Sequence, residues 1–321
     1  ILVSQQSGIS TKKNYQIDMH NNRIIVYIHN AEYNPHNIQI AVDIIDNLSS
    51  GFLHNLPISG NIDFFNEDLT DFDLFSLKDS FDGVIHLAAQ ASVPLSINDF
   101  QNSSNINLMC MTNVMNFCNK KSLPLVFASS SAIYGNLEIG DDAEDLTNLI
   151  SPYACDKYAM ELYAKTCFNT YGLSSLGLRF FNVYGPKQDP SSPYSGVISI
   201  FSDRITKTKP IVINGGHQTR DFIYVYDVVL CIIAALKKAS EELVCENVNV
   251  LTGKSYSIDY LAAEIAKIVG NKLSAEYKEL PDGDPERSEG TIGKMEEILS
   301  IDVSKFTLFS EGLMKTIKYI T

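Results

Sequence analysis

Short apolar segments alternate with longer, helix-like segments from about residue 38 to residue 185. Three of the short segments consist largely of β-branched or other apolar residues at consecutive positions, which is typical of strands buried on both faces of a sheet. They are IQIAVDIID (38–46), VIHLAA (84–89) and LPLVFASSS (123–131). Between the last two, the stretch 104–121 carries apolar side chains at positions 106, 109, 114, 117 and 118, which predicts one broad face of a helix.

A second helix is expected over residues 151–172, because both of its ends carry helix-terminating signals. Ser151 is a good N-cap, Pro152 fits the first helical turn, and Gly172 stands where the helix should end. The segment LSSLGLRFFNVYG (173–185) then supplies another strand. Strands and helices that alternate in this way predict an α/β fold with a doubly wound, mostly parallel sheet and helices on both faces.

The character of the chain changes after Gly185. The segment GPKQDPSSPYSG (185–196) is rich in Pro, Ser and Gly and is expected to be a loop, as is INGGHQTRDF (213–222). Helical patterns near 257–269 and 292–300 indicate a smaller α/β lobe in the C-terminal third.

The composition describes an ordinary globular protein and argues against some partners. Of the 321 residues, 45% are hydrophobic and 20% are charged. The formal net charge of -13 and the absence of a Lys/Arg cluster argue against nucleic acid as a partner. The longest apolar run, VVLCIIAAL (228–236), is about half as long as a membrane span. No signal peptide is visible in a chain that starts at Ile1, so the expectation is a cytoplasmic protein without a membrane partner.

Six cysteines are scattered along the chain without a CxxC pair and without histidines at metal-ligand spacing. They are Cys110, Cys118, Cys155, Cys167, Cys231 and Cys245. This pattern favours free thiols in a reducing compartment over disulfides, and it indicates no metal site.

Tyr153 and Lys157 are the first candidates for chemistry, because a spacing of four places them on one face of the predicted helix. An ammonium beside a phenol should favour the phenolate and lower its pKa, which suits a general acid/base acting on a hydroxyl. A Tyr-x-x-x-Lys pair in a chain with 16 tyrosines can also arise by chance. The serines of VFASSSAIYG (126–135), at the end of a predicted strand, strengthen the interpretation, although such a run can equally be turn chemistry.

Five segments, in this order and spacing, resemble the extended short-chain dehydrogenase/reductase family, and most of all its nucleotide-sugar 4-epimerases. They are HLAAQASVP (86–94), FASSSAIYG (127–135), SPYACDK (151–157), LRFFNVYGPKQDP (178–190) and QTRDFIYVYDVV (218–229). The resemblance implies a Rossmann-type NAD-binding domain over residues 1–180, to which residues 216–250 return. A nucleotide-sugar-binding domain would follow over residues 181–321, with dimerisation through the helices near 104–120 and 152–171.

The resemblance also implies a role for individual residues. Ser130, Tyr153 and Lys157 would be catalytic, and Tyr153 and Lys157 would also contact NAD. Asn105 is assigned to the family's TNV motif. The further cofactor-binding positions are Gly8, Asp46, Asn47, Asp68, Leu69, Leu87, Ala88, Ala89, Gln90 and Asn105. The substrate-binding positions are Ser92, Ser130, Asn182, Tyr194, Ser195, Arg220 and Arg287.

By the family's mechanism, Tyr153 would take the proton of the sugar 4-hydroxyl while hydride passes from C4 to NAD. The 4-keto sugar would turn over, and hydride would return to its other face. Related 4,6-dehydratases carry Thr-Asp-Glu at the positions of Ser130, Ser131 and Ala132, and related decarboxylases carry Glu at the last of these. Serine and alanine offer no carboxyl group there, so the sequence favours an epimerase, and the resemblance implies that its substrate is a UDP-sugar.

The N-terminal segment departs from the family pattern. In place of the glycine-rich ILVTGGxGFIG the chain reads ILVSQQSGIST, so that only Gly8 remains, and Gln5 and Thr11 replace the other two glycines. Those glycines allow positive φ or a close approach of backbone to pyrophosphate. Residues 12–22 match a helix poorly, and RIIVYIH (23–29) predicts a strand that the family lacks.

Two explanations for this departure stay open. Another segment could supply the phosphate contacts, in which case the chain is an NAD-dependent epimerase. Alternatively, the chain could be a non-catalytic protein of the same fold that binds a sugar nucleotide and has lost tight NAD binding.

Overall fold

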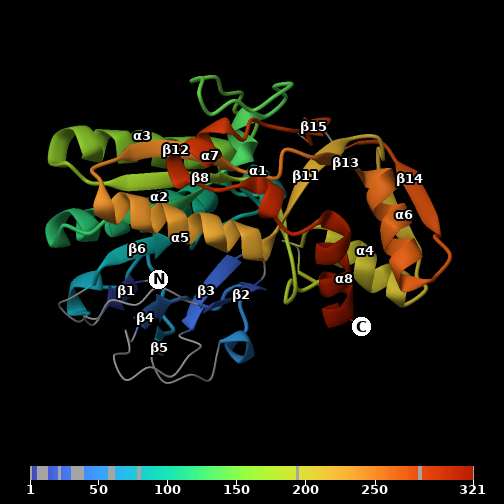
Figure 1. Ribbon diagram of the computed structural model, residues 1–321, viewed down its shortest axis with the longest axis horizontal. Coiled ribbons are helices and arrows are strands. Elements are labelled where there is room, and N and C mark those ends of the chain that lie inside the picture. The colour runs from blue at the N-terminus through green and yellow to red at the C-terminus, as the bar shows by residue number, and fades with distance from the viewer. Residues whose placement is uncertain are drawn as a thin grey trace.

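A seven-stranded sheet forms the centre of the fold, with the strand order β12-β8-β7-β6-β1-β4-β5 (Figure 1). The computed structural model describes residues 2–5, 14–20, 23–29, 40–56, 62–77, 81–192, 195–280 and 284–320. The strands are β1 (Leu2–Gln5), β4 (Ile40–Ile45), β5 (Ile62–Phe65), β6 (Gly83–His86), β7 (Leu125–Ser130), β8 (Ser175–Phe180) and β12 (Cys245–Val250). The three segments predicted as buried strands are therefore confirmed as β4, β6 and β7.

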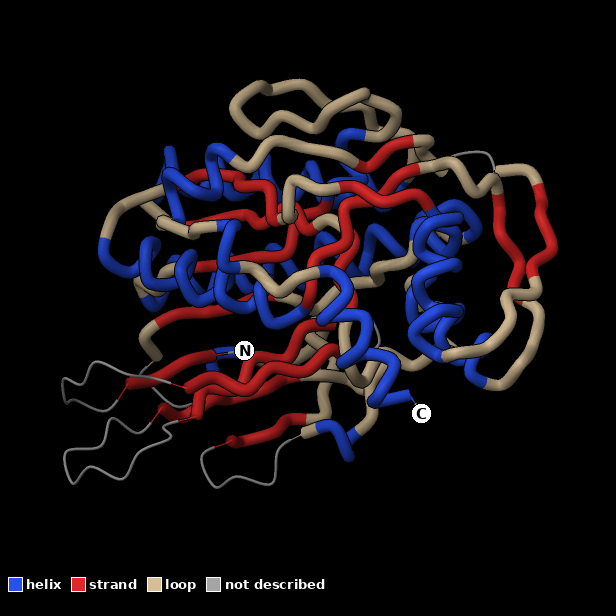
Figure 2. The backbone as a smooth tube through the Cα atoms, turned by 45° about the vertical axis from the view of Figure 1, so that its right-hand side comes forward, coloured by secondary structure: helices blue, strands red, loops and turns tan. Residues whose placement is uncertain are grey.

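Different helices cover the two faces of this sheet (Figures 1 and 2), which confirms the predicted doubly wound, Rossmann-type fold. They are α2 (Phe100–Lys121), α3 (Pro152–Tyr171) and α5 (Val225–Glu241). Val84 of β6 shares a buried apolar cluster with Phe117 and Met160 of the first two helices. The next residue, Ile85, belongs instead to the cluster of Val228 on α5. Successive residues of one strand thus serve opposite faces, as the pleat requires.

The predicted ends of the second helix are confirmed. The Ser151 side chain accepts a hydrogen bond from the Ala154 N–H, and Pro152 is the first helical residue. Gly172 follows the last turn with a φ of 73°, a left-handed conformation in which glycine has no Cβ to clash.

β1 is the exception to the parallel direction of the sheet. It pairs antiparallel with both β4 and β6, whereas the other described pairs of this sheet are parallel. Gln5, its last residue, lies opposite Ile40, the first residue of β4. The chain therefore leaves β1 on the side of the sheet where β4 begins, which is the side of the amino ends of the parallel strands. Asp46 follows the opposite, carboxyl end of β4.

The predicted strand at residues 23–29 is also confirmed. β3 (Arg23–His29) pairs antiparallel with β2 (Asn14–His20), and both strands lie against α5. A two-stranded hairpin thus follows β1, in the part of the chain where the family pattern would have a helix.

A smaller lobe lies at one end of the sheet (Figure 1). Its helices are α4 (Val197–Thr206), α6 (Ile258–Val269) and α8 (Phe309–Ile320), beside the strand pair β10 (Ile211–Asn214) and β14 (Ala275–Lys278). A small sheet joins the lobe to the rest, built from β9 (Asn182–Tyr184), β11 (Thr219–Tyr224), β13 (Ser255–Ser257) and β15 (Arg287–Ser288). Two short helices complete the fold, α1 (Val93–Asn98) and α7 (Gly293–Leu299).

One predicted loop is shorter than expected. Residues 213–222 were predicted to be loop, but β10 extends to Asn214 and β11 begins at Thr219. The reason is tertiary, since β11 gains partners on both sides from β9, β13 and β15. Because α5 packs on the large sheet and β12 is one of its strands, we propose that the segment returning to the first domain begins at Val225.

In the described part of the chain, no helix has both the length and the apolar character needed to cross a membrane. No disulfide joins any of the six cysteines, all of which lie in the described residues.

Candidate active site

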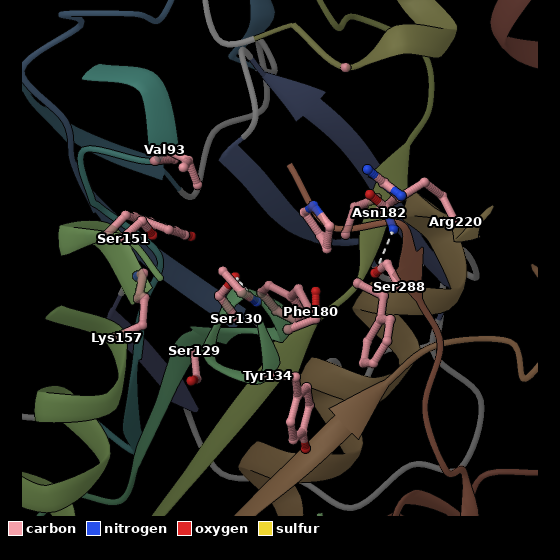
Figure 3. A pocket seen from close by; sticks show the side chains of 18 of the residues that line it. Val93, Ser129, Ser130, Tyr134, Ser151, Lys157, Phe180, Asn182, Arg220 and Ser288 are labelled. Carbon is pink, nitrogen blue, oxygen red and sulfur yellow. Dashed lines mark hydrogen bonds between the residues drawn. The ribbon is translucent and has the colours of Figure 1, made fainter. Parts of the chain in front are cut away.

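A cavity of about 380 Å³ opens at the carboxyl ends of the central parallel strands. Leu87 follows β6, Ser130 ends β7 and Phe180 ends β8, and all three line the cavity. The edge formed by the carboxyl ends of the strands is where open α/β sheets bind ligands. In Figure 3, Lys157 and Ser130 lie on one side of the cavity, and Asn182 and Arg220 lie on the other.

The three predicted catalytic residues meet on the first side. Lys157 is 2% exposed, and its Nζ donates a hydrogen bond to the Ala128 carbonyl at 2.8 Å. The same Nζ lies 5.8 Å from the centroid of the Tyr153 ring. The Ser130 side chain lies close enough to the Tyr153 phenol to lower its pKa, so Ser130, Tyr153 and Lys157 form one group at the cavity wall.

The predicted net lowering of the Tyr153 pKa is wrong for this arrangement. Burial raises the phenol pKa above its usual value of 10.0, the neighbouring Ser130 side chain opposes this, and the Asp156 carboxylate adds to it. Burial also lowers the pKa of Lys157 to about 8, although the neighbouring Asp156 carboxylate favours the ammonium. Desolvation is the largest cause of both shifts, because a charged group loses its hydration inside the protein.

Replacing Lys157 should therefore stabilise the fold at neutral pH. The folded chain disfavours the ammonium, so its free energy of unfolding should rise with pH between the folded value of about 8 and the ordinary value of 10.5. We expect Lys157→Met to raise the free energy of unfolding at pH 7 by about 1–3 kcal/mol, with a smaller gain at pH 10. Urea unfolding at the two pH values checks this, and a variant less stable than the parent at pH 7 would contradict it.

Polar groups suited to an anion line the opposite side of the cavity. Arg220 pairs with Asp284, with Nη2 and Oδ1 2.5 Å apart, and its side chain is 10% exposed. Asn182 Nδ2 donates to the Ser288 hydroxyl at 3.3 Å. Arg287 is more exposed and pairs with Glu138 at 3.1 Å. Two guanidinium groups and an amide thus face the same space from different segments, a donor set that suits a diphosphate.

A second hollow, of about 330 Å³, adjoins the first. Asn47 and Gln90 line it, and it shares Ala89 and Ala91 with the catalytic cavity. Asn47 follows Asp46 at the end of β4, and its side chain donates to Asp68 at 2.7 Å. The structure thus brings part of the predicted cofactor set to two hollows that share lining residues, one at the end of β4 and one at Lys157.

Some predicted residues lie elsewhere. Ser92 caps α1, accepting from the Leu95 N–H, and the Ser195 hydroxyl donates to the Asp189 carbonyl. Leu69 packs against the α2 side of the core, and Ala88 is not among the residues that line either hollow. Gly8 and Tyr194 lie outside the described residues.

The assignment of Asn105 does not fit the structure. Its side chain is exposed on α2 and does not line either hollow, and the letters TNV stand at positions 112–114. Asn107, two residues further on, is buried and hydrogen-bonded to the backbone of Gln90. A polar residue on the predicted apolar face of this helix was the signal that could have found it.

A buried ion pair behind the catalytic group was not predicted from the sequence. Glu161 continues the spacing of Tyr153 and Lys157 by four more residues. Its carboxylate accepts two hydrogen bonds from Arg179 of β8, at 2.9 and 2.7 Å, and one from Ser129 at 2.5 Å. The pair ties α3 to the strands that carry the cavity floor.

Comparisons with known proteins agree with this site. The family model described as "NAD dependent epimerase/dehydratase family" matches residues 28–250. The chain is 36% identical over 264 residues to the "Putative UDP-glucose 4-epimerase" of Methanocaldococcus jannaschii, an alignment that covers 80% of this chain and 84% of that protein.

Two solved structures extend the similarity to three dimensions. The UDP-N-acetylglucosamine 4-epimerase of Methanobrevibacter ruminantium M1, in complex with UDP-N-acetylmuramic acid, has a TM-score of 0.80 and 34% identity, covering 86% of this chain and 89% of that one. The UDP-glucose 4-epimerase of Thermus thermophilus, in complex with NAD, has a TM-score of 0.75 and 31% identity, covering 87% and 90%. The family implied by the five motifs is thereby confirmed: the chain belongs to the NAD-dependent epimerase/dehydratase family, with nucleotide-sugar 4-epimerases among its relatives.

Proposed function

We propose that this protein inverts C4 of a UDP-linked sugar with the help of bound NAD. The observation that carries the proposal is one cavity with acid/base chemistry at one end and two arginines at the other. Ser130, Tyr153 and Lys157 would face the sugar, and Arg220 and Arg287 would hold the diphosphate. The solved relatives named above include complexes with a UDP-sugar and with NAD, which supports both assignments.

The residues present fit the two ends of NAD. Asp46 offers a carboxylate to ribose hydroxyls at the end of β4, next to the second hollow. Ala89 and Ala91 stand where the two hollows meet, and their small side chains leave room for a dinucleotide to pass. NAD, when bound, supplies a hydride acceptor that can return the hydride to the substrate.

The side chains of this chain carry the proton transfers. The Tyr153 phenol oxygen takes the proton of the 4-hydroxyl, and the Ser130 hydroxyl hydrogen-bonds the same substrate oxygen and orients it. Lys157, beside the phenol ring, supplies a positive charge that stabilises the phenolate. Arg220, Arg287 and Asn182 hold the diphosphate while the sugar presents first one face and then the other.

Epimerisation suits this cavity better than dehydration or decarboxylation. Ser130, Ser131 and Ala132 line it at the end of β7 and carry no carboxyl group. Loss of a hydroxyl from the sugar would need an acid there, and abstraction of a carbon-bound proton would need a base. The carboxyl groups that do line the cavity, Asp284 and Glu289, lie with the arginine segments.

Turnover of defined sugars tests the proposal. UDP-glucose, UDP-N-acetylglucosamine and UDP-glucuronic acid should each be incubated with the protein and NAD, and the products separated as C4 epimers. We expect conversion of at least one of them to an equilibrium mixture with its 4-epimer. A product lacking a hydroxyl or a carboxyl group would show instead a dehydratase or a decarboxylase.

A homodimer in the cytoplasm is the expected form of the protein. α2 and α3 lie side by side and expose large apolar side chains, namely Phe100, Met109, Leu162 and Tyr163. Two copies could bury them in a four-helix bundle. Cysteines that form no disulfide suit a reducing compartment. Light scattering coupled to size exclusion should give twice the mass of one chain.

A further inference from the structure

A buried carboxylate, Asp156, lies between α3 and α2. It is 3% exposed, and the side chains that donate hydrogen bonds to it from α2 are neutral. The Ser104 hydroxyl donates to Oδ1 at 2.6 Å, and Ser103 Oγ and Asn107 Nδ2 donate to Oδ2 at 3.3 and 3.1 Å. Burying an ionised carboxylate among neutral donors is costly, so a role beyond packing is expected of it.

Asp156 determines how the Asn107 amide is oriented. A carboxylate only accepts hydrogen bonds, so only the amide nitrogen of Asn107 can face it. The amide oxygen must then point the other way, where it accepts from the Gln90 N–H at 2.8 Å. The same amide nitrogen also reaches the Gln90 carbonyl at 3.2 Å, so both backbone groups of this residue are held.

Gln90 belongs to the turn formed by residues 87–91, which borders both hollows. Ala89 and Ala91 line each of them, and Gln90 lines the second. The Gln90 side chain is tied down as well, with Nε2 donating to the Ser92 carbonyl at 3.1 Å and to Ser103 Oγ at 3.3 Å. The conformation of this turn thus depends on contacts from α2 that Asp156 organises.

We propose that Asp156 is a positioning residue which, through Asn107, holds the turn of residues 87–91 in the conformation that receives NAD. The proposal rests on the NAD site of the proposed function. It explains why a charged residue stands inside the interface of two helices, one position before the catalytic lysine.

The charge of Asp156 also acts on the catalytic group. It favours the ammonium of Lys157 and raises the pKa of Tyr153. The titratable groups that face Lys157 are Asp156 and Tyr153 on its own helix and Cys110 on α2. Removing the carboxylate should therefore move the pH profile of turnover, which a purely structural contact would not do.

Asp156→Asn keeps the shape of the side chain but removes its charge. The Asn107 amide can then flip, so that its oxygen no longer has to face the Gln90 N–H. In the protein stripped of nucleotide, we expect the Gln90 amide hydrogen to exchange about 10–100 times faster, the factor that follows from losing a hydrogen bond oriented by a charge. The dissociation constant for NAD should rise by a similar factor, and UDP affinity should stay unchanged.

Ser104→Ala is the matched control, because it removes one donor to Asp156 and leaves the contact with Asn107 in place. It should leave Gln90 exchange within twofold of the parent. In the double variant Asp156→Asn with Asn107→Ala, the effects on exchange should not add, since both act through one amide. Should Asp156→Asn fail to fold, Asp156→Ser provides the same test with a smaller side chain.

Unchanged exchange at Gln90 in a folded Asp156 variant would overturn the proposal, leaving the carboxylate as a contact between α2 and α3. The exchange measurement needs neither NAD nor turnover. Failure of the proposed function would appear separately, as a parent protein that converts no UDP-sugar.

Discussion

Tyr153→Phe is expected to lower kcat for C4 epimerisation by a factor of about 10²–10⁴, the usual contribution of a positioned general acid/base. The phenol oxygen is the group of the catalytic set that can exchange a proton with the sugar hydroxyl while its ring stays fixed beside Lys157. Phenylalanine fills the same volume without that oxygen. The cavity, the arginines and the shape of α3 should therefore persist, and the affinity for UDP should be unchanged.

Tyr171→Phe is the control for this experiment. It removes the same atom from a tyrosine of the same helix, whose side chain is exposed. Turnover should be measured for both variants under saturating substrate, and UDP binding by calorimetry. A Tyr153→Phe variant that retains the turnover of the parent would show that another group moves the proton.

Glu161→Ala is expected to reduce the free energy of unfolding by about 3–5 kcal/mol, because it leaves the Arg179 guanidinium buried without its counter-charge. The two side chains are 2% and 5% exposed, and their hydrogen bonds are bidentate. Arg179 also donates to the Tyr134 hydroxyl at 2.8 Å, but a neutral acceptor cannot compensate the charge. Urea unfolding followed by circular dichroism measures the loss.

Two further variants test whether the loss of stability comes from the burial of this ion pair. Glu242→Ala breaks the exposed Lys238–Glu242 pair, at 2.6 Å, and should cost no more than about 0.5 kcal/mol. Replacing both Glu161 and Arg179 by methionine should recover most of the stability lost in Glu161→Ala, since no uncompensated charge remains. If Glu161→Ala cost as little as the surface control, the pair would not contribute to holding α3 on the sheet.

The parts of the fold that follow from local pattern could be predicted from the sequence. Runs of buried residues located β4, β6 and β7, and the end signals at Ser151 and Gly172 located α3. The motif spacing was enough to bring Ser130, Tyr153 and Lys157 together, because the end of one strand and the start of a helix border the same cavity.

Features that depend on pairing between distant segments could not be predicted in this way. The antiparallel direction of β1 is a property of its partners β4 and β6, and the strand β11 exists because three other strands pair with it. The contact of Asp156 with Asn107 joins positions 49 apart. The raised pKa of Tyr153 likewise follows from burial, which no spacing of residues reveals.

The direction of β1 determines which residues are placed to bind NAD. The family's glycine-rich segment should follow β1 at the carboxyl edge of the sheet, whereas β1 here ends beside Ile40, where β4 begins. The hollow between Asn47 and Ala91 nevertheless offers space for NAD next to the catalytic group. Binding of NAD would then rely on the contacts of residues 46–91 more than in relatives with the full glycine motif.

The most direct test is the nucleotide content of the purified protein. The protein should be denatured, and the supernatant assayed enzymatically for NAD and NADH. An NAD-dependent epimerase that regenerates its cofactor in each cycle should release close to one nucleotide per chain, or take up that amount when NAD is added. A protein that carries no nucleotide and binds none of the added NAD would contradict the account, and Tyr153 and Lys157 would then have no hydride acceptor to work with.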